Sequence, residues 1–491
     1  MLSVLVFLPL AFAIIIVLVA RHDAPLSRSL ALGGSVLTGL VALYLAVRFN
    51  FNGHGFQFQE TYPWLPPIGA RYHLGLDGLS LLLIALTVIV TPVAILMADE
   101  SVAERVPLYM ALVMLLETSL LGVFVALDLV LFYLFWEGVL IPAYLLIGVW
   151  GGERRIYAAL KYVIYTMLGS LLMLAGVVGV YVYSTAHSFD IPALIAPPNQ
   201  TSPSLQTPLL IAFGLAFAIK AALWPFHSWV PDVYTESATP TTILLAGVVS
   251  KMGVYGFLRI VLPMFPHAMR TLSVVAAILA VIGILYGALL ALTQWDAKRL
   301  VACSSISHMC LILLGVFALN MQGVQGATLQ MVNHGITTAA LFAIVGAIAW
   351  RWGTTDLRRL GGLGHRALVL AAIFSVVALS ALGLPGLNSF AGEFLILLGA
   401  FRSAPAYGVF GTLGVILAAW YMLRLFQGAM HGPAVAGLDR PAHGAALRTN
   451  ELVALLPLVV LIVWIGVAPG SWLYPAASAA SAIVSAVGGA Q

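Results

Sequence analysis

The sequence predicts an all-α, polytopic membrane protein of about fourteen transmembrane helices. Hydrophobic residues make up 62% of its 491 residues and charged residues only 8%, too few charges to solvate a soluble protein of this size. Apolar runs of spanning length follow one another along the whole chain. Two of them are interrupted, at Pro225 and at Pro385, so we expect two broken helices.

The expected spans lie at approximately 1–20, 28–49, 78–98, 107–126, 128–149, 157–184, 207–230, 238–262, 271–293, 299–319, 324–350, 366–400, 404–427 and 450–469. The first run lacks a basic segment and a small-residue cleavage site, so we expect a retained helix. Asp128 marks the expected boundary between the fourth and fifth spans. Residues 50–77, rich in Gly, Pro and aromatic residues, are expected to cap the outer interface.

The two broken spans are the seventh and the twelfth of this series. They are an odd number of helices apart, so their breaks run in opposite directions across the membrane, as in inverted-topology repeats. We therefore expect two inverted five-helix repeats, each with one broken helix. The predicted regions are 1–106 (helices 1–3 and the outer loop), 107–262 (first repeat), 263–430 (second repeat) and 431–491 (last helix and tail).

Basic residues predict the orientation. Most Lys and Arg residues fall in loops on one side, and only five are counted on the other: Arg48, Arg71, Arg259, Arg270 and Arg402. Because cytoplasmic loops carry the excess of Lys and Arg, both termini should lie outside the cytoplasm. The net charge of +4 then reflects these loops, and no nucleic-acid partner is expected.

Lys220 is the first candidate for function. It lies about thirteen residues, or roughly 20 Å, into an apolar run that begins at Pro208, so it is expected near mid-bilayer. An ionisable residue at that depth is costly and typically belongs to an ion or proton path. Lys251 lies inside the next span. A buried lysine can release its proton whereas an arginine stays charged, which favours a proton relay over simple charge neutralisation.

Two carboxylates lie at comparable depth in the first half. Glu137 follows Asp128 by nine residues and needs a nearby cation, for which Lys220 is the obvious candidate. Glu117 lies about ten residues into the fourth span. Its sequence context leaves two readings open, an auxiliary proton-path carboxylate or one bonded to the hydroxyls of Thr118 or Ser119.

The second half offers His308 and His334, on neighbouring spans and at a similar predicted depth. A cluster of hydroxyl and amide side chains surrounds them: Ser304, Ser305, Ser307, Asn333, Thr337 and Thr338. Together they predict a hydrated polar row. Glu393 follows the break at Pro385. His227 lies just beyond Pro225, where it would serve a cytoplasmic uptake route.

Redox and metal chemistry find no support in the sequence. There is no dinucleotide-binding glycine motif after a strand and no cysteine cluster. Cys303 and Cys310 are seven residues apart on one expected helix, too far apart for a disulfide, so we expect buried thiols. We therefore expect no metal and no cofactor in this chain.

Four segments resemble the antiporter-like membrane subunits of respiratory complex I, NADH:quinone oxidoreductase. They are WEGVLIPAYLLIGVWGGERRIYAALKY, KAALWPFHSWVPDVYTESATPTTILLAGVVSKMGVYGFLR, DAKRLVACSSISHM and GLPGLNSFAGEF. The resemblance extends from about Glu117 to Arg424. Within the family it is closest in type to chain M, or subunit 4, which has a glutamate in the twelfth helix where chains L and N have lysine. Glu393 fits that type, and the chain leaves no room for the long lateral helix of chain L.

The resemblance implies a proton path through six side chains: Glu137, Lys220, Lys251, His308, His334 and Glu393. It makes Glu137 the partner of Lys220, Lys251 the central relay, and Glu393 the terminal protonation site. The two histidines bridge the half-channels.

The resemblance also implies partners and a location. The chain would be a proton-translocating subunit in a bacterial inner membrane, beside subunits of the L and N types. NADH, flavin, iron–sulfur clusters and quinone would lie in partner subunits. The alternatives are a subunit of a multisubunit sodium/proton antiporter or of a membrane hydrogenase, since the same buried Lys and Glu would serve them.

Overall fold

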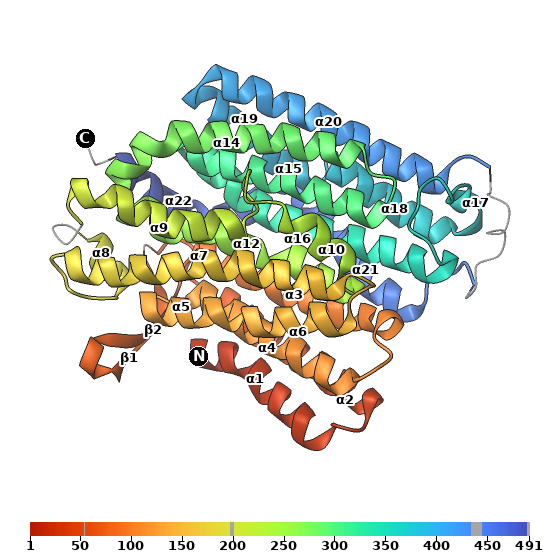
Figure 1. The fold of residues 1–491 in the computed structure, drawn as a ribbon, viewed down its shortest axis with the longest axis horizontal. Coiled ribbons are helices and arrows are strands. Elements are labelled where there is room, and N and C mark those ends of the chain that lie inside the picture. Colours follow the sequence, from red (N-terminus) through yellow and green to blue (C-terminus); the bar gives the residue numbers. More distant parts are fainter. Residues whose placement is uncertain (54, 197–200, 434–443, 489–491) are drawn as a thin grey trace.

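The structure, a computed structural model, describes residues 1–53, 55–196, 201–433 and 444–488 (Figure 1). Within these residues, thirteen helical segments are long and apolar enough to cross a membrane. A shorter apolar helix and its continuation, α18 (Leu368–Ala381) and α19 (Asn388–Ser403), occupy the place of the remaining predicted span. The predicted all-α membrane fold of about fourteen spans is therefore confirmed.

In the described part of the chain, ten spans are single helices: α1 (Leu2–Val19), α2 (Ala24–Arg48), α3 (Gly78–Ser101), α4 (Val106–Val125), α7 (Arg155–Tyr183), α14 (Pro266–Leu292), α15 (Ala297–Phe317), α16 (Met321–Trp352), α20 (Pro405–Met430) and α21 (Thr449–Val467). The divided spans are α5 (Leu129–Gly138) with α6 (Leu140–Trp150), α9 (Pro203–Lys220) with α10 (Trp229–Glu236), and a five-part span over Thr239–Met264. Its parts are α11 (Thr239–Leu244), η2 (Leu245–Val249), α12 (Lys251–Gly256), η3 (Phe257–Val261) and α13 (Leu262–Met264). Two short helices connect spans: α8 (Ile191–Ile195) and α17 (Leu363–Arg366).

Aspartates start several of these helices. Asp128 follows α4 and accepts hydrogen bonds from the backbone N–H groups of Val130 and Leu131, so it caps α5. The predicted boundary between the fourth and fifth spans is therefore correct. Asp296 likewise caps α15, the helix that carries His308.

Both predicted breaks are present. α9 ends at Lys220, and residues 221–228 form turns before α10 begins. α18 ends at Ala381, and the chain turns through Gly383 and Gly386, both at positive φ, before α19. Figure 1 shows the two broken spans running in opposite directions along the bundle, α9 to α10 one way and α18 to α19 the other. This agrees with the expected inverted repeats, while the exact limits of the four regions stay a prediction.

The spans divide into a central and a peripheral set. The spans Thr239–Met264 and Ala297–Phe317 are 100% buried, whereas α1, α2, α20 and α21 are only 33% buried, so apolar side chains on these four face outward. A bundle that exposes apolar side chains on its outer helices is suited to lipid. Lys251 and His308 lie on the two fully buried spans. These two titratable residues are therefore held in the protein interior, away from the lipid-facing surface.

Residues 50–77 differ from the loop that we expected. They contain two antiparallel strands, β1 (Gln57–Leu65) and β2 (Ala70–Leu76), joined by the short helix η1 (Pro66–Ile68). His73 on β2 contacts Asp190, the cap of α8, with 2.5 Å between Nδ1 and Oδ1. The hairpin lies at the same end of the bundle as the N-terminus (Figure 1).

The tail also differs from expectation. Residues Gly470–Gly488 form a helix, α22, that packs on α3 and α16, and Arg270 donates to the carbonyl of Gly488 at 2.7 Å. Of the predicted region 431–491, residues 434–443 and 489–491 lie outside the described part. α22 thus covers one end of the central helices.

Two expectations about single residues had different outcomes. Arg259, counted among the outer loops, is in fact buried in η3 and paired with Asp77, the cap of α3, at 2.5 Å. The loop assignment is wrong because the buried carboxylate lets the helix continue past the arginine. Cys303 and Cys310 are free and buried, as predicted.

Candidate functional site

Lys220 occupies the end of the half-helix α9. It is 1% exposed, and its Nζ donates to the hydroxyl of Tyr162 on α7 at 3.0 Å. The same ammonium lies over two aromatic rings, 5.1 Å from the centroid of Tyr162 and 5.5 Å from that of Trp136. Ring faces attract cations, and the C-terminal end of a helix carries partial negative charge. These contacts favour the charged form of Lys220 without a direct carboxylate contact.

Glu137, near the end of α5, is half-buried and interacts electrostatically with Lys220 and Tyr162. No ion pair within 4.0 Å joins Glu137 to Lys220, two side chains that the structure describes. The carboxylate therefore acts on the ammonium through space.

Lys251 lies at the start of α12, directly after the π-helical turn η2, and is fully buried. Its Nζ contacts the carbonyl of Ala246 at 2.5 Å, the hydroxyl of Ser250 at 3.3 Å and Nδ1 of His334 at 2.8 Å. An ammonium has three N–H donors, so these three acceptors satisfy it when His334 Nδ1 carries no proton. π-helical turns often occur at functional sites.

His334 also lies next to His308. The two rings, on α16 and α15, have centroids 5.5 Å apart. Nε2 of His334 is buried and makes no hydrogen bond within the described residues. Both rings line a cavity of about 10 Å³, close to the ~10–15 Å³ that one water needs.

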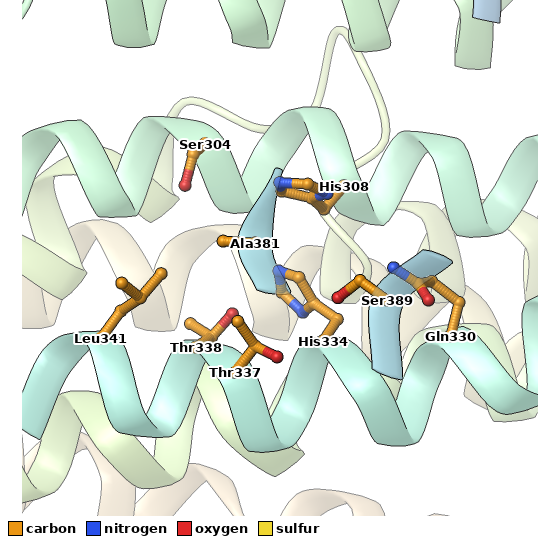
Figure 2. Close-up of a pocket in the computed structure, with 9 residues that line it drawn as sticks. All are labelled: Ser304, His308, Gln330, His334, Thr337, Thr338, Leu341, Ala381 and Ser389. Carbon is orange, nitrogen blue, oxygen red and sulfur yellow. The ribbon is translucent and has the colours of Figure 1, made fainter. Parts of the chain in front are cut away.

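Polar side chains surround this cavity. Figure 2 shows the two histidines on facing helices with these neighbours around them: Ser304, Gln330, Thr337, Thr338 and Ser389. A water there would have several polar partners, which is the condition for buried water. The cavity gives the predicted polar row a physical location.

Glu393 on α19 completes the row. Its Oε1 lies 3.6 Å from Nδ1 of His308 and accepts a hydrogen bond from Nε2 of Gln330 at 3.2 Å. Nε2 of His308 is in turn 3.0 Å from the hydroxyl of Tyr421 on α20. The structure thus brings together four of the six predicted side chains in one connected series, with Glu137 and Lys220 as a second group.

The two auxiliary candidates lie outside this series. Glu117 is 1% exposed on α4, and Ser35 on α2 donates to its Oε1 at 3.4 Å. The hydroxyls of Thr118 and Ser119 donate instead to backbone carbonyls of their own helix, so the partner expected from sequence proximity is wrong. A helix turns neighbouring side chains to different faces, which is why residues next in sequence are poor partners.

His227 lies in the turn between α9 and α10. Its ring packs on Tyr286 with centroids 4.9 Å apart, and it interacts electrostatically with Lys161. Lys161 itself pairs with Asp232 on α10 at 2.7 Å, and Arg299 contacts the same carboxylate at 3.3 Å. A polar cluster therefore lies beside His227.

Sequence reasoning missed the residues that serve the series from other helices: Tyr162, Tyr421 and Gln330. Tyrosines in apolar spans are common interfacial anchors, so neither tyrosine carried a signal of its own. Gln330 precedes His334 by four residues and so shares its helix face, which was a readable signal. Among the described residues, no group of three or more His, Cys, Asp and Glu side chains is arranged to hold a metal ion.

A membrane-spanning helix bundle with a buried series of Lys, His and Glu defines the class of antiporter-like translocating subunits. The profile of the family described as NADH:quinone oxidoreductase/Mrp antiporter, TM, matches residues 126–418. The chain belongs to this family, which confirms the resemblance drawn from its motifs.

Curated relatives cover nearly the whole chain. NADH-quinone oxidoreductase subunit M of Rhodobacter capsulatus is 42% identical over 482 residues, covering 96% of this chain and 93% of that protein. The subunit of the same name from Rickettsia prowazekii is 37% identical over 474 residues, covering 96% of each. The similarity to subunit M thus extends beyond the four motifs to nearly the whole chain.

Solved structures agree. A chain of respiratory complex I from Thermus thermophilus with bound NADH matches with a TM-score of 0.89 and 33% identity, covering 99% of this chain and 100% of that one. A chain of the Mrp complex from a Dietzia species matches with a TM-score of 0.86 at 23% identity, covering 99% and 98%, a likeness of fold alone. The protein is therefore an antiporter-like, proton-translocating membrane subunit of the complex I type.

Proposed function

We propose that protons cross this subunit through the buried groups from Lys220 to Glu393. The observation that carries the proposal is the contact series of Lys251, His334, His308 and Glu393, with 2.8 Å at one end and 3.6 Å at the other. Each of these groups can bind and release a proton, and the central gap has room for about one water. A series of this kind supports proton transfer along the middle of the membrane.

Glu137 is proposed as the switch of this path. A carboxylate near an ammonium stabilises its charge, and that stabilisation falls as the two move apart. Lys220 therefore holds its proton while Glu137 is close and releases it towards Lys251 when Glu137 is drawn away. Glu393 receives the proton at the far end.

The energy for this movement is proposed to come from quinone reduction elsewhere in the assembly. The relatives named subunit M support a place in the membrane arm of complex I, beside subunits of the L and N types. NADH, flavin, iron–sulfur clusters and quinone would then be bound by partner subunits. This chain contributes the proton path and no redox centre.

The proposed location is a bacterial inner membrane with both termini on the periplasmic side. Support comes from the excess of Lys and Arg in the loops at the opposite end of the helices. In this orientation His227 and the cluster of Lys161, Asp232 and Arg299 face the cytoplasmic half, where they would serve proton uptake. Glu117 is proposed as an auxiliary carboxylate of the first half.

Isolation of the native assembly tests the proposal. The chain is tagged, extracted in mild detergent and separated on a native gel that is stained for NADH dehydrogenase activity, and the bands are analysed by mass spectrometry. Co-migration with flavin and iron–sulfur subunits is the expected result. Recovery with only cofactor-free polytopic subunits, together with sodium-dependent proton flux, would instead identify an antiporter. Recovery with hydrogenase subunits would identify a membrane hydrogenase.

A further inference from the structure

The two buried lysines of the first half are not in contact with each other. Lys220 donates to Tyr162, and Lys251 donates to Ser250. The path proposed above requires a proton to travel between them, so this inference rests on the proposed function. The side chains between the two lysines therefore decide whether transfer is possible.

Much of the surrounding interior is aromatic. Phe217 packs against Trp136 at 5.3 Å and against Phe257 at 5.8 Å between ring centroids. Trp229 is fully buried, and its indole N–H donates to the carbonyl of Ile219 at 2.9 Å. Rings of this kind accept no protons, so hydroxyl groups are the side-chain groups here that can pass one on.

Tyr234 on α10 supplies such a hydroxyl. It is 1% exposed, and its hydroxyl donates at 3.3 Å to the carbonyl of Leu245, which also accepts the backbone N–H of Ser250 at 3.2 Å. Its ring packs on Trp229, with centroids 6.0 Å apart, and Tyr162 packs on the same indole at 5.5 Å. The two tyrosines interact electrostatically across it. Buried hydroxyls thus occur in the order Tyr162, Tyr234, Ser250 from one lysine to the other.

We infer that the hydroxyls of Tyr162, Tyr234 and Ser250 relay a proton between Lys220 and Lys251. A hydroxyl can accept one proton while it donates another, so each passes the charge without remaining ionised. The N–H bond of the Lys220 ammonium breaks as an O–H bond forms on Tyr162, the proton of the Tyr162 hydroxyl passes to the oxygen of Tyr234, and the proton of the Tyr234 hydroxyl passes to the oxygen of Ser250. The last step breaks the Ser250 O–H bond and forms an N–H bond on the neutral amine of Lys251. One proton has moved, and no other reactant is consumed.

The break after α9 gives this relay its geometry. α9 ends at Lys220, and α10 begins at Trp229. α10 places the hydroxyl of Tyr234 against the backbone carbonyl of Leu245 in η2. Ser250 follows η2 and directly precedes Lys251. The interrupted helix therefore places one hydroxyl between two lysines that lie on different spans.

The test removes single hydroxyl groups and keeps the rings. Tyr234→Phe and Tyr162→Phe are made in the complete complex, reconstituted in vesicles, and NADH-driven proton uptake is measured per assembled complex. Tyr109→Phe is the matched control, because Tyr109 is also fully buried and its hydroxyl bonds Thr241 at 2.9 Å, outside the relay. Ser250→Ala serves as an independent test should a tyrosine variant not assemble.

The expected result is a fall in proton uptake of roughly tenfold or more for both relay tyrosines, since a positioned proton-transfer group contributes roughly 10²–10⁴-fold. The solvent deuterium isotope effect on turnover should rise in the same variants, which a merely structural defect would not cause. Tyr109→Phe should behave as the wild type.

Wild-type pumping in Tyr234→Phe, Tyr162→Phe and Ser250→Ala would overturn the relay. Lys220→Ala distinguishes this from a failure of the proposed function. If Lys220→Ala abolishes pumping while the hydroxyl variants pump normally, the path stands and the relay is wrong. If Lys220→Ala pumps normally as well, the proposed function fails and the relay with it.

Discussion

At the scale of single residues, the two buried lysines are held in different ways. Lys251 has a carbonyl, a hydroxyl and an imidazole nitrogen as acceptors, whereas Lys220 contacts one hydroxyl and two ring faces. Cation–π contacts are weaker than hydrogen bonds to charged groups. Lys220 is therefore the lysine whose charge a distant carboxylate can control, and Lys251 the one built to receive a proton in a fixed place.

Replacing Lys251 by methionine tests the central position. Lys251→Met keeps much of the side-chain volume and removes the titratable amine, so NADH-driven proton uptake should be lost. NADH oxidation with an artificial electron acceptor, which needs only the redox subunits, should be unchanged. Both activities are measured on the same purified complex. Proton uptake at the wild-type ratio to electrons transferred would contradict the role of Lys251.

Glu137 offers a graded test of the switch. Glu137→Gln removes the negative charge, whereas Glu137→Asp keeps the charge and moves it back by one methylene. Because the carboxylate acts on Lys220 through space, charge should matter more than contact. Proton uptake in vesicles should therefore fall much further in Glu137→Gln than in Glu137→Asp. Equal losses in the two variants would mean that side-chain shape, not charge, is what the site requires.

At the scale of elements, one buried ion pair fixes the last long span to the core. Arg351 near the end of α16 donates two hydrogen bonds to Glu451 near the start of α21, at 2.6 and 2.5 Å, and Arg351 is 0% exposed. In this geometry two parallel N–H···O bonds join the guanidinium to both oxygens of the carboxylate. The pair connects α21 to the helix that carries His334.

Breaking this pair should destabilise the subunit. Glu451→Ala leaves the Arg351 charge buried without its carboxylate, which costs about 3–5 kcal/mol. The double variant Arg351→Met with Glu451→Leu removes both charges and should recover most of the loss. The measurement is the midpoint temperature for release of this subunit from the detergent-solubilised complex. A single variant as stable as the wild type would mean that the pair is not a structural link.

The elements also show why some of the fold could be predicted and some could not. Span positions follow from hydropathy, and the breaks follow from Pro225 and Pro385, which are local properties of the chain. The helix α22 was missed because its Ala- and Ser-rich sequence has low hydropathy. Its buried residues recur at helical spacing, and this was a readable signal: Ala476, Ala479, Ala480, Ile483 and Val487.

The candidate site was likewise predictable from the sequence in part. Charged and imidazole residues inside apolar runs stand out in a sequence, so five of the six candidate path residues were identifiable from their depth, and Glu393 from the helix break that it follows. Their partners were not, because Tyr162, Tyr421 and Ser35 come from helices distant in sequence and are ordinary residues in a membrane span. The position of Arg259 depended on the Asp77 carboxylate of another helix in the same way.

At the scale of the whole molecule, the hairpin and the loops of the opposite end offer a test of orientation. Tyr62 on β1 is 60% exposed, and the side chain of Arg358, before α17, is 61% exposed. Both are well exposed, which makes them a suitable pair for labelling. Cys303 and Cys310 are fully buried, so the unmodified chain provides a low background.

A membrane-impermeant thiol reagent should label Tyr62→Cys in intact cells. Arg358→Cys should be labelled only after the membrane is opened, because the Arg-rich end is expected in the cytoplasm. The extent of labelling is measured by mass spectrometry, with the unmodified chain as the control. The reverse pattern would invert the proposed orientation and place both termini in the cytoplasm.

The π-helical turns on either side of α12 have a consequence for insertions and deletions. Each such turn closes over one residue more than an α-helical turn, as the bond from the Ser250 N–H to the Leu245 carbonyl illustrates. Deleting one residue from η2 would leave a span that is still apolar and still long enough to cross a membrane. The turn would then close as an ordinary α-helical turn, which would move the residues of η2 from their present positions. Lys251 directly follows this turn and its Nζ contacts the carbonyl of Ala246 within it, so the position of the amine depends on the exact length of η2 as well as on its composition.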